Sequence, residues 1–285
     1  MKTSIQLRLT VVFSLLTIHS FGQSLDIDNI YNFSPSKLTK AEEEAKLPAL
    51  DGLWGKVKSD TTINLPLLRK ELTAPNHNPF FYYDGSMLLL SLSKNDNDKT
   101  AAAEAIAKCD LSDIDQQEYV RTLNQLSNDG INVTKAAVQV LKDTSFDFFL
   151  PQHVMYFRQG DCLTYMLLPQ KAEFYVDTLM LLFKSVNTNS QKSILYLLWF
   201  AYTCKGDSLI NSAIYDRTLN KEVSSYAKEL MKSGQLDNET KRQINSMTRS
   251  QVEELRNGSL RRFSDEALDE LMISTLALRK DTNCR

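Results

Sequence analysis

The chain has 285 residues, of which 42% are hydrophobic and 24% are charged, and its formal net charge is −2. This length allows one large domain or one extended repeat array with a buried core. The 13 Phe, 11 Tyr and 2 Trp exclude disorder on a large scale, and the near-neutral charge without a basic stripe excludes a nucleic-acid-binding surface. Glycine is scarce, with nine residues, which favours helices over short strands and tight hairpins.

Residues 1–23 have the pattern of a secretory signal peptide. Lys2 and Arg8 supply the positive end, a short apolar stretch follows, and small residues lead up to a cleavage site between Gly22 and Gln23. The apolar stretch is about half as long as a bilayer span, and no cysteine follows it that could take up a lipid. We therefore expect cleavage near Gly22-Gln23 and export to the periplasm or the cell exterior.

The mature chain has no second segment suited to a membrane. Loss of Lys2 and Arg8 leaves 31 basic and 35 acidic residues, a formal charge of −4. The most apolar later run, 194–201, is far too short to span a bilayer and fits a buried helix segment. No stable membrane insertion of the mature chain is expected.

The N-terminal part of the mature chain is expected to form a lead and a helical cap. Residues 24–37 are polar and predict a flexible lead with two prospective anchors, Tyr31 and Phe33. Residues 38–79 predict short helices that cap one end of the core. The residues expected to interrupt these helices are Pro48, Gly52, Gly55, Pro66, Pro75 and Pro79.

From residue 80 onward, apolar residues recur at helical spacing, so residues 38–285 are expected to form a single all-α domain. Its repeat-like part covers 80–235, and C-terminal helices cover 237–280. The segment 146–150 is the one candidate for an extended conformation, although Pro151 argues against a central strand. The predicted helices are 80–92, 98–108, 112–126, 131–142, 152–167, 171–186, 190–204, 207–214, 220–232, 237–256 and 264–280.

Two spacings indicate internal repetition. Asp84-Gly85 recurs as Asp129-Gly130, and Gly160-Asp161 recurs as Gly206-Asp207, at offsets of 45 and 46 residues. Offsets in the forties are typical of repeats made of helix pairs. Independent turns rich in Gly and Asp would produce the same spacings by chance.

A resemblance to HEAT-type helical repeats extends over about residues 80–230. Residues 216–230 resemble the second half of such a repeat, in which an Asp-containing turn precedes a helix with Val223, Ala227 and Leu230 on one face. The segment 115–126 has a similar Val-Arg step but lacks the alanine that follows it in the repeat. The resemblance implies an α-solenoid of stacked antiparallel helix pairs, whose repeats contact their neighbours and offer a surface for binding.

The sequence contains no established catalytic or metal-binding motif. H-E-x-x-H, C-x-x-C, G-x-S-x-G and the P-loop pattern are all absent. The mature chain has two histidines, His77 and His153, in turn or helix-start settings. The run 95–98 resembles a calcium loop but lacks the required glycine, so a simple turn is expected. We therefore expect neither a metal nor a cofactor.

The four cysteines are at positions 109, 162, 204 and 284. Export permits disulfides, while the helical pattern around the first three also fits ordinary buried thiols. The pair expected for any disulfide is Cys162 with Cys204, because their separation of 42 residues is near one repeat length.

The expected function is that of an exported helical-repeat scaffold or binding protein for a protein or glycan partner. Tyr82, Tyr83 and Asp84 are the candidate binding residues, because a run of aromatic residues surrounds a helix and exposed tyrosines suit partner or sugar contacts. One alternative is an exported hydrolase with a site near His153, Asp161 and Cys162. Another is a structural subunit of an envelope complex, which would expose a large apolar patch.

Overall fold

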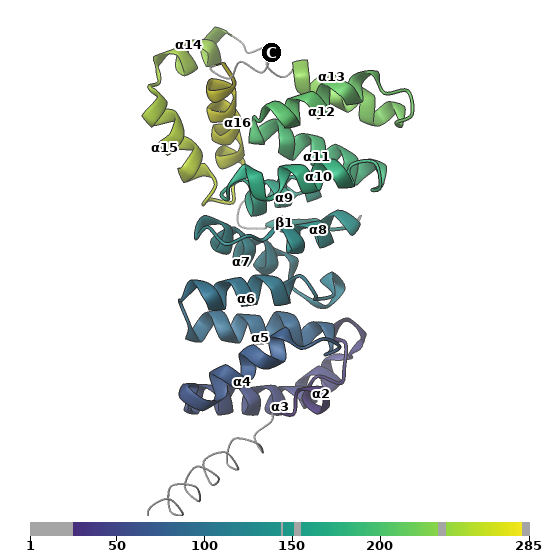
Figure 1. The fold of residues 1–285 in the computed structure, drawn as a ribbon, viewed down its shortest axis with the longest axis vertical. Helices are drawn as coiled ribbons and strands as arrows, with labels where there is room; N and C mark the ends of the chain where they lie inside the picture. The colour runs from purple at the N-terminus through teal and green to yellow at the C-terminus, as the bar shows by residue number, and fades with distance from the viewer. Residues whose placement is uncertain (1–24, 144, 151–154, 233–237, 281–285) are drawn as a thin grey trace, which may run out of the picture.

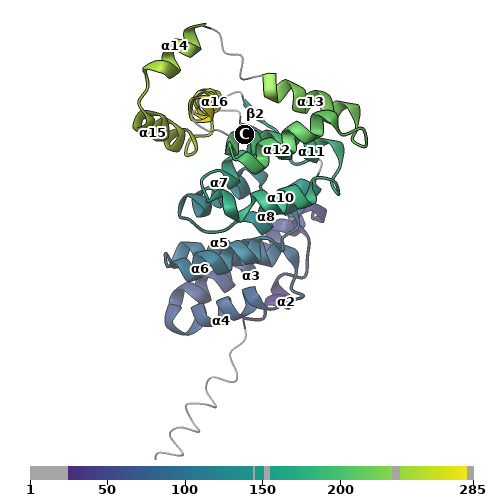
Figure 2. The same cartoon turned by 45° about the horizontal axis from the view of Figure 1, so that its top comes forward.

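The computed structural model describes residues 25–143, 145–150, 155–232 and 238–280. These residues form an elongated stack of antiparallel helix pairs, with fifteen α-helices, three short 3₁₀ helices and one β-hairpin (Figure 1). The N-terminal helices form one end of the stack, and helices α11 to α16 form the other end (Figure 2). The predicted all-α class with stacked helix pairs is confirmed.

The N-terminal residues are packed on the core, unlike the flexible lead predicted from the sequence. Leu25, Ile27 and Tyr31 are 1%, 3% and 1% exposed. They accompany the short helix α2 (Ile27–Ile30) and the 3₁₀ helix η1 (Pro35–Lys37). Tyr31 is thus an anchor, as expected, and Leu25 and Ile27 add two buried side chains that the polar composition of the segment conceals.

Helices α3 (Lys40–Ser59) and α4 (Thr61–Thr73) form the expected cap, but they are not broken into short pieces. Pro48 lies inside α3 and Pro66 inside α4. Both prolines are exposed, so the helix carbonyl that loses its N–H partner at each site can bind water instead. A capping box between Thr39 and Glu42 begins α3, with the backbone N–H of Thr39 donating to Glu42 Oε2 at 2.8 Å.

The next helices continue the stack in neighbouring pairs. They are α5 (Pro79–Leu92), α6 (Asp96–Ile106), α7 (Gln116–Asn128) and α8 (Thr134–Lys142), with the 3₁₀ helix η2 (Leu111–Asp113) between α6 and α7. Helix α4 packs on α5 and α6, α6 packs on α7 and α8, and α8 packs on α9. Contacts between adjacent elements are typical of helical-repeat folds.

In the sequence, a β-hairpin lies between α8 and the following helices. Strands β1 (Phe148–Leu150) and β2 (Met155–Phe157) pair antiparallel, with Phe149 opposite Tyr156. The predicted extended segment is therefore a strand, but the helix predicted from 152 begins only at α9 (Gln159–Leu167). The reason is the two-residue alternation in β2, where Met155 and Phe157 are buried and Tyr156 is exposed.

The second half of the stack contains the 3₁₀ helix η3 (Ala172–Phe174), α10 (Val176–Leu182), α11 (Thr188–Ala201), α12 (Cys204–Tyr215) and α13 (Lys221–Lys232). Helix α11 packs on α9, α12, α13 and α16. The last three helices, α14 (Asn238–Ser246), α15 (Arg249–Ser259) and α16 (Asp265–Lys280), lie beside this part of the stack. The predicted helix 237–256 is split, because Thr248 begins α15 with its own capping box to Gln251.

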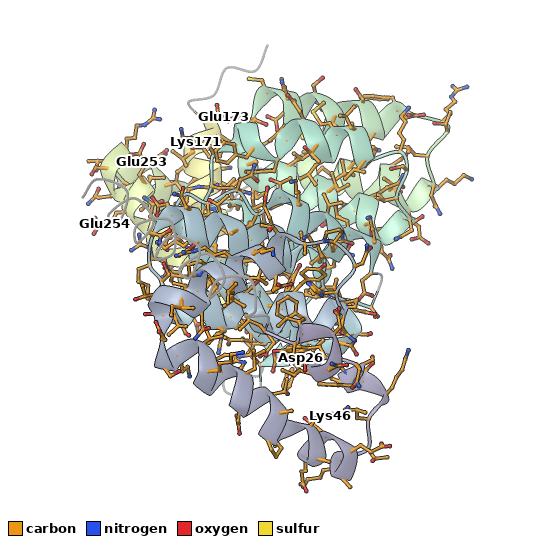
Figure 3. All side chains as sticks on the ribbon, turned by 60° about the horizontal axis from the view of Figure 1, so that its bottom comes forward. Asp26, Lys46, Lys171, Glu173, Glu253 and Glu254 are labelled. Atoms are coloured by element: carbon orange, nitrogen blue, oxygen red, sulfur yellow. The ribbon has the colours of Figure 1, made fainter. Side chains whose placement is uncertain are left out.

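The apolar side chains form two buried clusters. The first holds residues of α2 to α6, and the second runs from α6 to α16. Charged side chains of both signs, including Lys46, Lys171 and Glu253, project from the outer surface (Figure 3). Across the described parts of the chain, no helix combines the length and the apolar character needed to cross a bilayer.

Two arginines attach the C-terminal helices to the end of α11. Arg256 of α15 is 9% exposed and donates to the carbonyl oxygen of Phe200 at 2.9 Å and to Thr275 Oγ1 at 2.8 Å. Arg279 of α16 donates to the carbonyl oxygen of Trp199 at 2.9 Å. The last carbonyls of a helix have no partner within it and carry partial negative charge, so a guanidinium group is well suited to bind them.

We predict that Arg256→Met destabilises the protein by about 2–4 kcal/mol, because it leaves a buried carbonyl and a buried hydroxyl without their donor. Urea unfolding followed by circular dichroism measures the change. The matched control is Arg249→Met in the same helix, whose exposed pair with Glu253 contributes less than about 0.5 kcal/mol. Equal stability of the two variants would contradict the role assigned to Arg256.

Candidate functional site

Two of the three binding residues predicted from the sequence, Tyr82 and Asp84, form hydrogen bonds with other residues of the protein. Tyr82 is 4% exposed, and its hydroxyl donates to the carbonyl oxygen of Ala74 at 2.8 Å. Asp84 accepts hydrogen bonds from the Trp54 indole at 2.9 Å and from the Tyr31 hydroxyl. This carboxylate therefore joins the N-terminal segment and α3 to α5.

Tyr83, the third of these residues, is half-buried. Its ring centroid lies 6.5 Å from that of Tyr119, and burial raises the pKa of its hydroxyl. Tyr82, Tyr83 and Asp84 thus hold the first part of the stack together. Tyr82 is buried, whereas Tyr83 and Asp84 are partly exposed.

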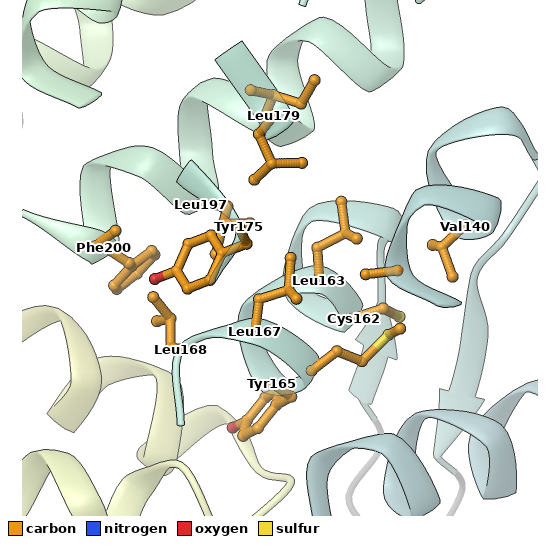
Figure 4. Close-up of a cluster of buried hydrophobic side chains, with 14 of the residues drawn as sticks. Val140, Cys162, Leu163, Tyr165, Leu167, Leu168, Tyr175, Leu179, Leu197 and Phe200 are labelled. Atoms are coloured by element: carbon orange, nitrogen blue, oxygen red, sulfur yellow. The ribbon is translucent and has the colours of Figure 1, made fainter. Parts of the chain in front are cut away.

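The cysteine residues do not have the arrangement expected from the sequence. Cys162 is a free thiol with 0% exposure, packed among buried side chains such as Val140 and Leu163 (Figure 4). It therefore forms no disulfide with Cys204, although Cys204 is disulfide-bonded. The expected Cys162–Cys204 pair is not present.

Cys162 is also unsuited to nucleophilic catalysis. Burial raises the pKa of its thiol well above the ordinary value, and the reactive form of cysteine is the thiolate. The proposed base, His153, lies outside the described residues. Asp161, in contrast to the enclosed Cys162, lines a cavity.

That cavity has a volume of about 530 Å³, within the range of roughly 300–1,000 Å³ typical of small-molecule sites. The β-hairpin, the N-terminal end of α9, and helices α11 and α13 form its walls. We refer to it as the Asp161 cavity. Its lining residues are Phe146, Asp147, Tyr156, Arg158, Gln159, Gly160, Asp161, Asn189, Lys192, Ser193, Tyr196 and Tyr226.

Asp161 is held in place at the start of α9. Its Oδ2 accepts a hydrogen bond from the backbone N–H of Arg158 at 3.0 Å, and the hydroxyl of Tyr196 also donates to its carboxylate. Burial is the largest influence on this carboxyl group and raises its pKa, while the two hydrogen bonds oppose that shift. A carboxylate that is only partly compensated inside a cavity is a common feature of functional sites.

Tyr196 reaches Asp161 because position 160 has no side chain. A Cβ added to Gly160 would lie 3.1 Å from Cδ1 of Tyr196, closer than an ordinary contact. The other side of the Tyr196 ring packs edge-on against Phe200, with centroids 4.8 Å apart. Gly160 thus allows the ring to lie against the first turn of α9.

Tyr226 completes the inner wall from α13. The side chain is half-buried, and burial followed by the charge of Asp161 raises its pKa to about 12. Among the described residues its hydroxyl has no hydrogen-bond partner. Tyr226 can therefore donate a hydrogen bond to a bound molecule at neutral pH.

The rim of the Asp161 cavity is polar and aromatic. Tyr156 is 51% exposed, and its hydroxyl donates to the carboxylate of Asp147. Arg158 is exposed beside it. Across the opening, Lys192 forms an ion pair with Glu222 at 2.8 Å.

Gln159, another lining residue, is held by hydrogen bonds to the end of α8. It is 8% exposed, and its Nε2 donates to the carbonyl oxygens of Val140 at 2.7 Å and Asp143 at 2.8 Å. Its Oε1 is buried without a hydrogen-bond donor from the described residues. Unpaired buried polar atoms are rare in folded proteins, so this atom marks a place where a donor would be stabilising.

A second depression crosses α4, α6 and α8 and has a volume of about 760 Å³. Its charged groups already have partners in the protein. Lys135 pairs with Glu104 at 3.2 Å, and Lys108 donates to the carbonyl oxygen of Leu72 at 3.1 Å. Alanines line much of the remaining surface. The Asp161 cavity is therefore the stronger candidate site, since polar groups from several segments converge in it.

Most residues of this site could not be identified from the sequence. Asp161 is one of the sequence-based candidates, but Tyr196 is expected in the core and Tyr226 has no distinguishing pattern. The one local signal is the Gly160-Asp161 pair, which recurs as Gly206-Asp207.

We predict that Asp161 titrates above about 3.9, the ordinary value for aspartate, and that Tyr196→Phe raises its pKa further. The hydroxyl of Tyr196 stabilises the charged carboxylate, so its removal favours the protonated form. Carboxyl ¹³C NMR during a pH titration measures both values, with Tyr215→Phe at an exposed site as control.

The raised pKa of Asp161 also determines the direction in which its ionisation changes the stability of the fold with pH. Because the folded-state pKa of Asp161 is raised, its ionisation opposes folding above that pKa, and the penalty disappears as the pH falls through the folded and then the unfolded value. A pKa of Asp161 at or below 3.9 in the native protein would refute this description of the site.

We also predict that unfolding the oxidised mature protein without reductant exposes the thiols of Cys109 and Cys162, while Cys204 stays unreactive until reductant is added. Reductant should raise the total to the four cysteines of the sequence. In the native state both thiols should react slowly with a thiol reagent, because burial raises the pKa of Cys109 to about 12 and that of Cys162 well above its usual value. Four reactive thiols before reduction would contradict the bonded state of Cys204.

Comparisons with protein-family models, with curated proteins and with solved structures give no match for this chain. The chemistry of the Asp161 cavity and the architecture that forms it are therefore the basis for assigning a function.

Proposed function

We propose that this chain is an exported binding protein of HEAT-like helical-repeat architecture, which holds a ligand or a group on a partner in the Asp161 cavity. The observation that carries the proposal is the convergence of Asp161, Tyr196 and Tyr226 on one open space. These residues come from α9, α11 and α13. Concave sites with a few convergent polar groups are the usual binding sites of proteins.

The packing of α13 supports the HEAT-like part of the proposal. Val223, Ala227 and Leu230, which carry the resemblance in the sequence, are 0%, 0% and 7% exposed. They form the face that α13 packs against α11 and α12. Tyr226 lies beside this face and contributes to the cavity. A repeat helix of this kind buries one side and presents another to a ligand.

Export is supported by the signal-like residues 1–23 and by the bonded state of Cys204. Disulfides persist in oxidising compartments such as the bacterial periplasm and are rare in the cytosol. The burial of Cys162 in the core counts against the form of the hydrolase alternative in which this thiol is the nucleophile.

The proposal predicts a partner that depends on the Asp161 cavity. The mature chain, beginning at Gln23, would be immobilised and exposed to envelope extract of its own host, and the retained proteins and glycans would be identified. We expect Tyr226→Ala to lose the retained component, because the substitution removes one wall of the cavity. Circular dichroism and thermal unfolding would verify that the variant is folded.

Tyr215→Ala is the matched control, because Tyr215 is 82% exposed at the end of α12 and does not line the cavity. Tyr226→Phe, which keeps the ring, provides a second variant should Tyr226→Ala unfold. Equal retention by the wild-type chain and by folded Tyr226 variants would show that the cavity is not the binding site. Retention of nothing by the wild-type chain would count against a binding function.

A further inference from the structure

We infer that the Asp161 cavity binds a neutral saccharide; this inference rests on the proposed function and gives the chemical class of its ligand. Three properties of the lining support it: the balance of charges, the three tyrosine rings, and the mixture of hydrogen-bond donors and acceptors.

The charges of the lining are balanced. Asp147 and Asp161 are acidic, and Arg158 and Lys192 are basic. Lys192 also pairs at 2.8 Å with Glu222, which is not one of the lining residues, so the lining itself carries two groups of each sign. A strongly charged ligand gains affinity from a site dominated by the opposite charge. The lining of the Asp161 cavity offers no such excess, so a ligand without net charge fits it best.

Tyrosine rings supply the apolar contact area. Tyr156, Tyr196 and Tyr226 each present an apolar ring with a polar hydroxyl at its tip. Tyr156 is half exposed, like its strand partner Phe149, so part of its ring is available to a ligand. A pyranose ring has apolar C–H faces bordered by hydroxyl groups and is complementary to such a surface.

The lining contains both hydrogen-bond donors and acceptors. The hydroxyl of Tyr226 and the guanidinium of Arg158 can donate, while the carboxylates of Asp147 and Asp161 can accept. A saccharide hydroxyl both donates and accepts hydrogen bonds, so a chain of hydroxyls can satisfy this mixed set. The volume of about 530 Å³ leaves room for more than an isolated ion.

The test uses the mature chain and an array of immobilised oligosaccharides in three groups: neutral, acidic (uronic or sulfated) and amino-bearing. We expect binding to members of the neutral group. Titration calorimetry with the best neutral oligosaccharide should then show that Tyr156→Ala and Tyr226→Ala each weaken binding about tenfold or more. Tyr215→Ala, at an exposed site outside the cavity, should bind as the wild type does.

Because Tyr156 is half exposed on the hairpin, its substitution keeps the test valid even should Tyr226→Ala fail to fold. Preference for acidic or amino-bearing sugars, or neutral binding that is unchanged in both tyrosine variants, would overturn the inference. The absence of all saccharide binding would also overturn it. If the extract component is still retained in a Tyr226-dependent manner, the proposed binding function stands and only the ligand class is wrong. If the extract component is not retained either, both the proposed binding function and the saccharide assignment are wrong.

Discussion

The contact between two arginines and the carbonyl end of α11 organises the larger part of the structure. Arg256 and Arg279 come from different C-terminal helices, and both donate to the last turn of α11. This helix also packs on α9, α12 and α13 and carries Tyr196 into the cavity. Hydrogen bonds to charged donors in buried surroundings are among the stronger ones in proteins. Fixing the end of α11 therefore positions both the C-terminal helices and one wall of the candidate site.

The helical class followed from local properties of the sequence, but several boundaries did not. Scarce glycine and apolar residues at helical spacing are enough to predict stacked helix pairs. The sequence predicts that Pro48 interrupts a helix. An exposed proline is tolerated inside α3, because water can bind the helix carbonyl that has lost its N–H partner. The strand around Tyr156 was missed because β2 has only three residues and α9 begins two residues after its end. These helix and strand boundaries depend on tertiary contacts, which a local sequence pattern does not reveal.

The candidate site was harder to predict, since its geometry depends on side-chain direction. Asp161 and Cys162 are adjacent in sequence, but successive residues in a helix point about 100° apart. One therefore faces the cavity and the other the core, and the pairing suggested by their proximity fails. Tyr226 comes from a helix that no sequence spacing connects to Asp161. Gly160 was visible as part of a repeated Gly-Asp pair, but its place in the first turn of α9 and its role in admitting the Tyr196 ring became clear only from the packing.

The alanine-rich helix α6 contributes to both apolar clusters, with Ala102 and Ala105 in the first and Ala103 and Ile106 in the second. Small side chains let α6 pack closely on α5, whereas its contacts with α7 and α8 are less extensive. Stacks of this kind open as separate cooperative units when the coupling between units is weak. The N-terminal end could thus fray and reclose as a unit of its own. The Asp161 cavity, formed entirely by residues beyond 145, would keep its shape during such excursions.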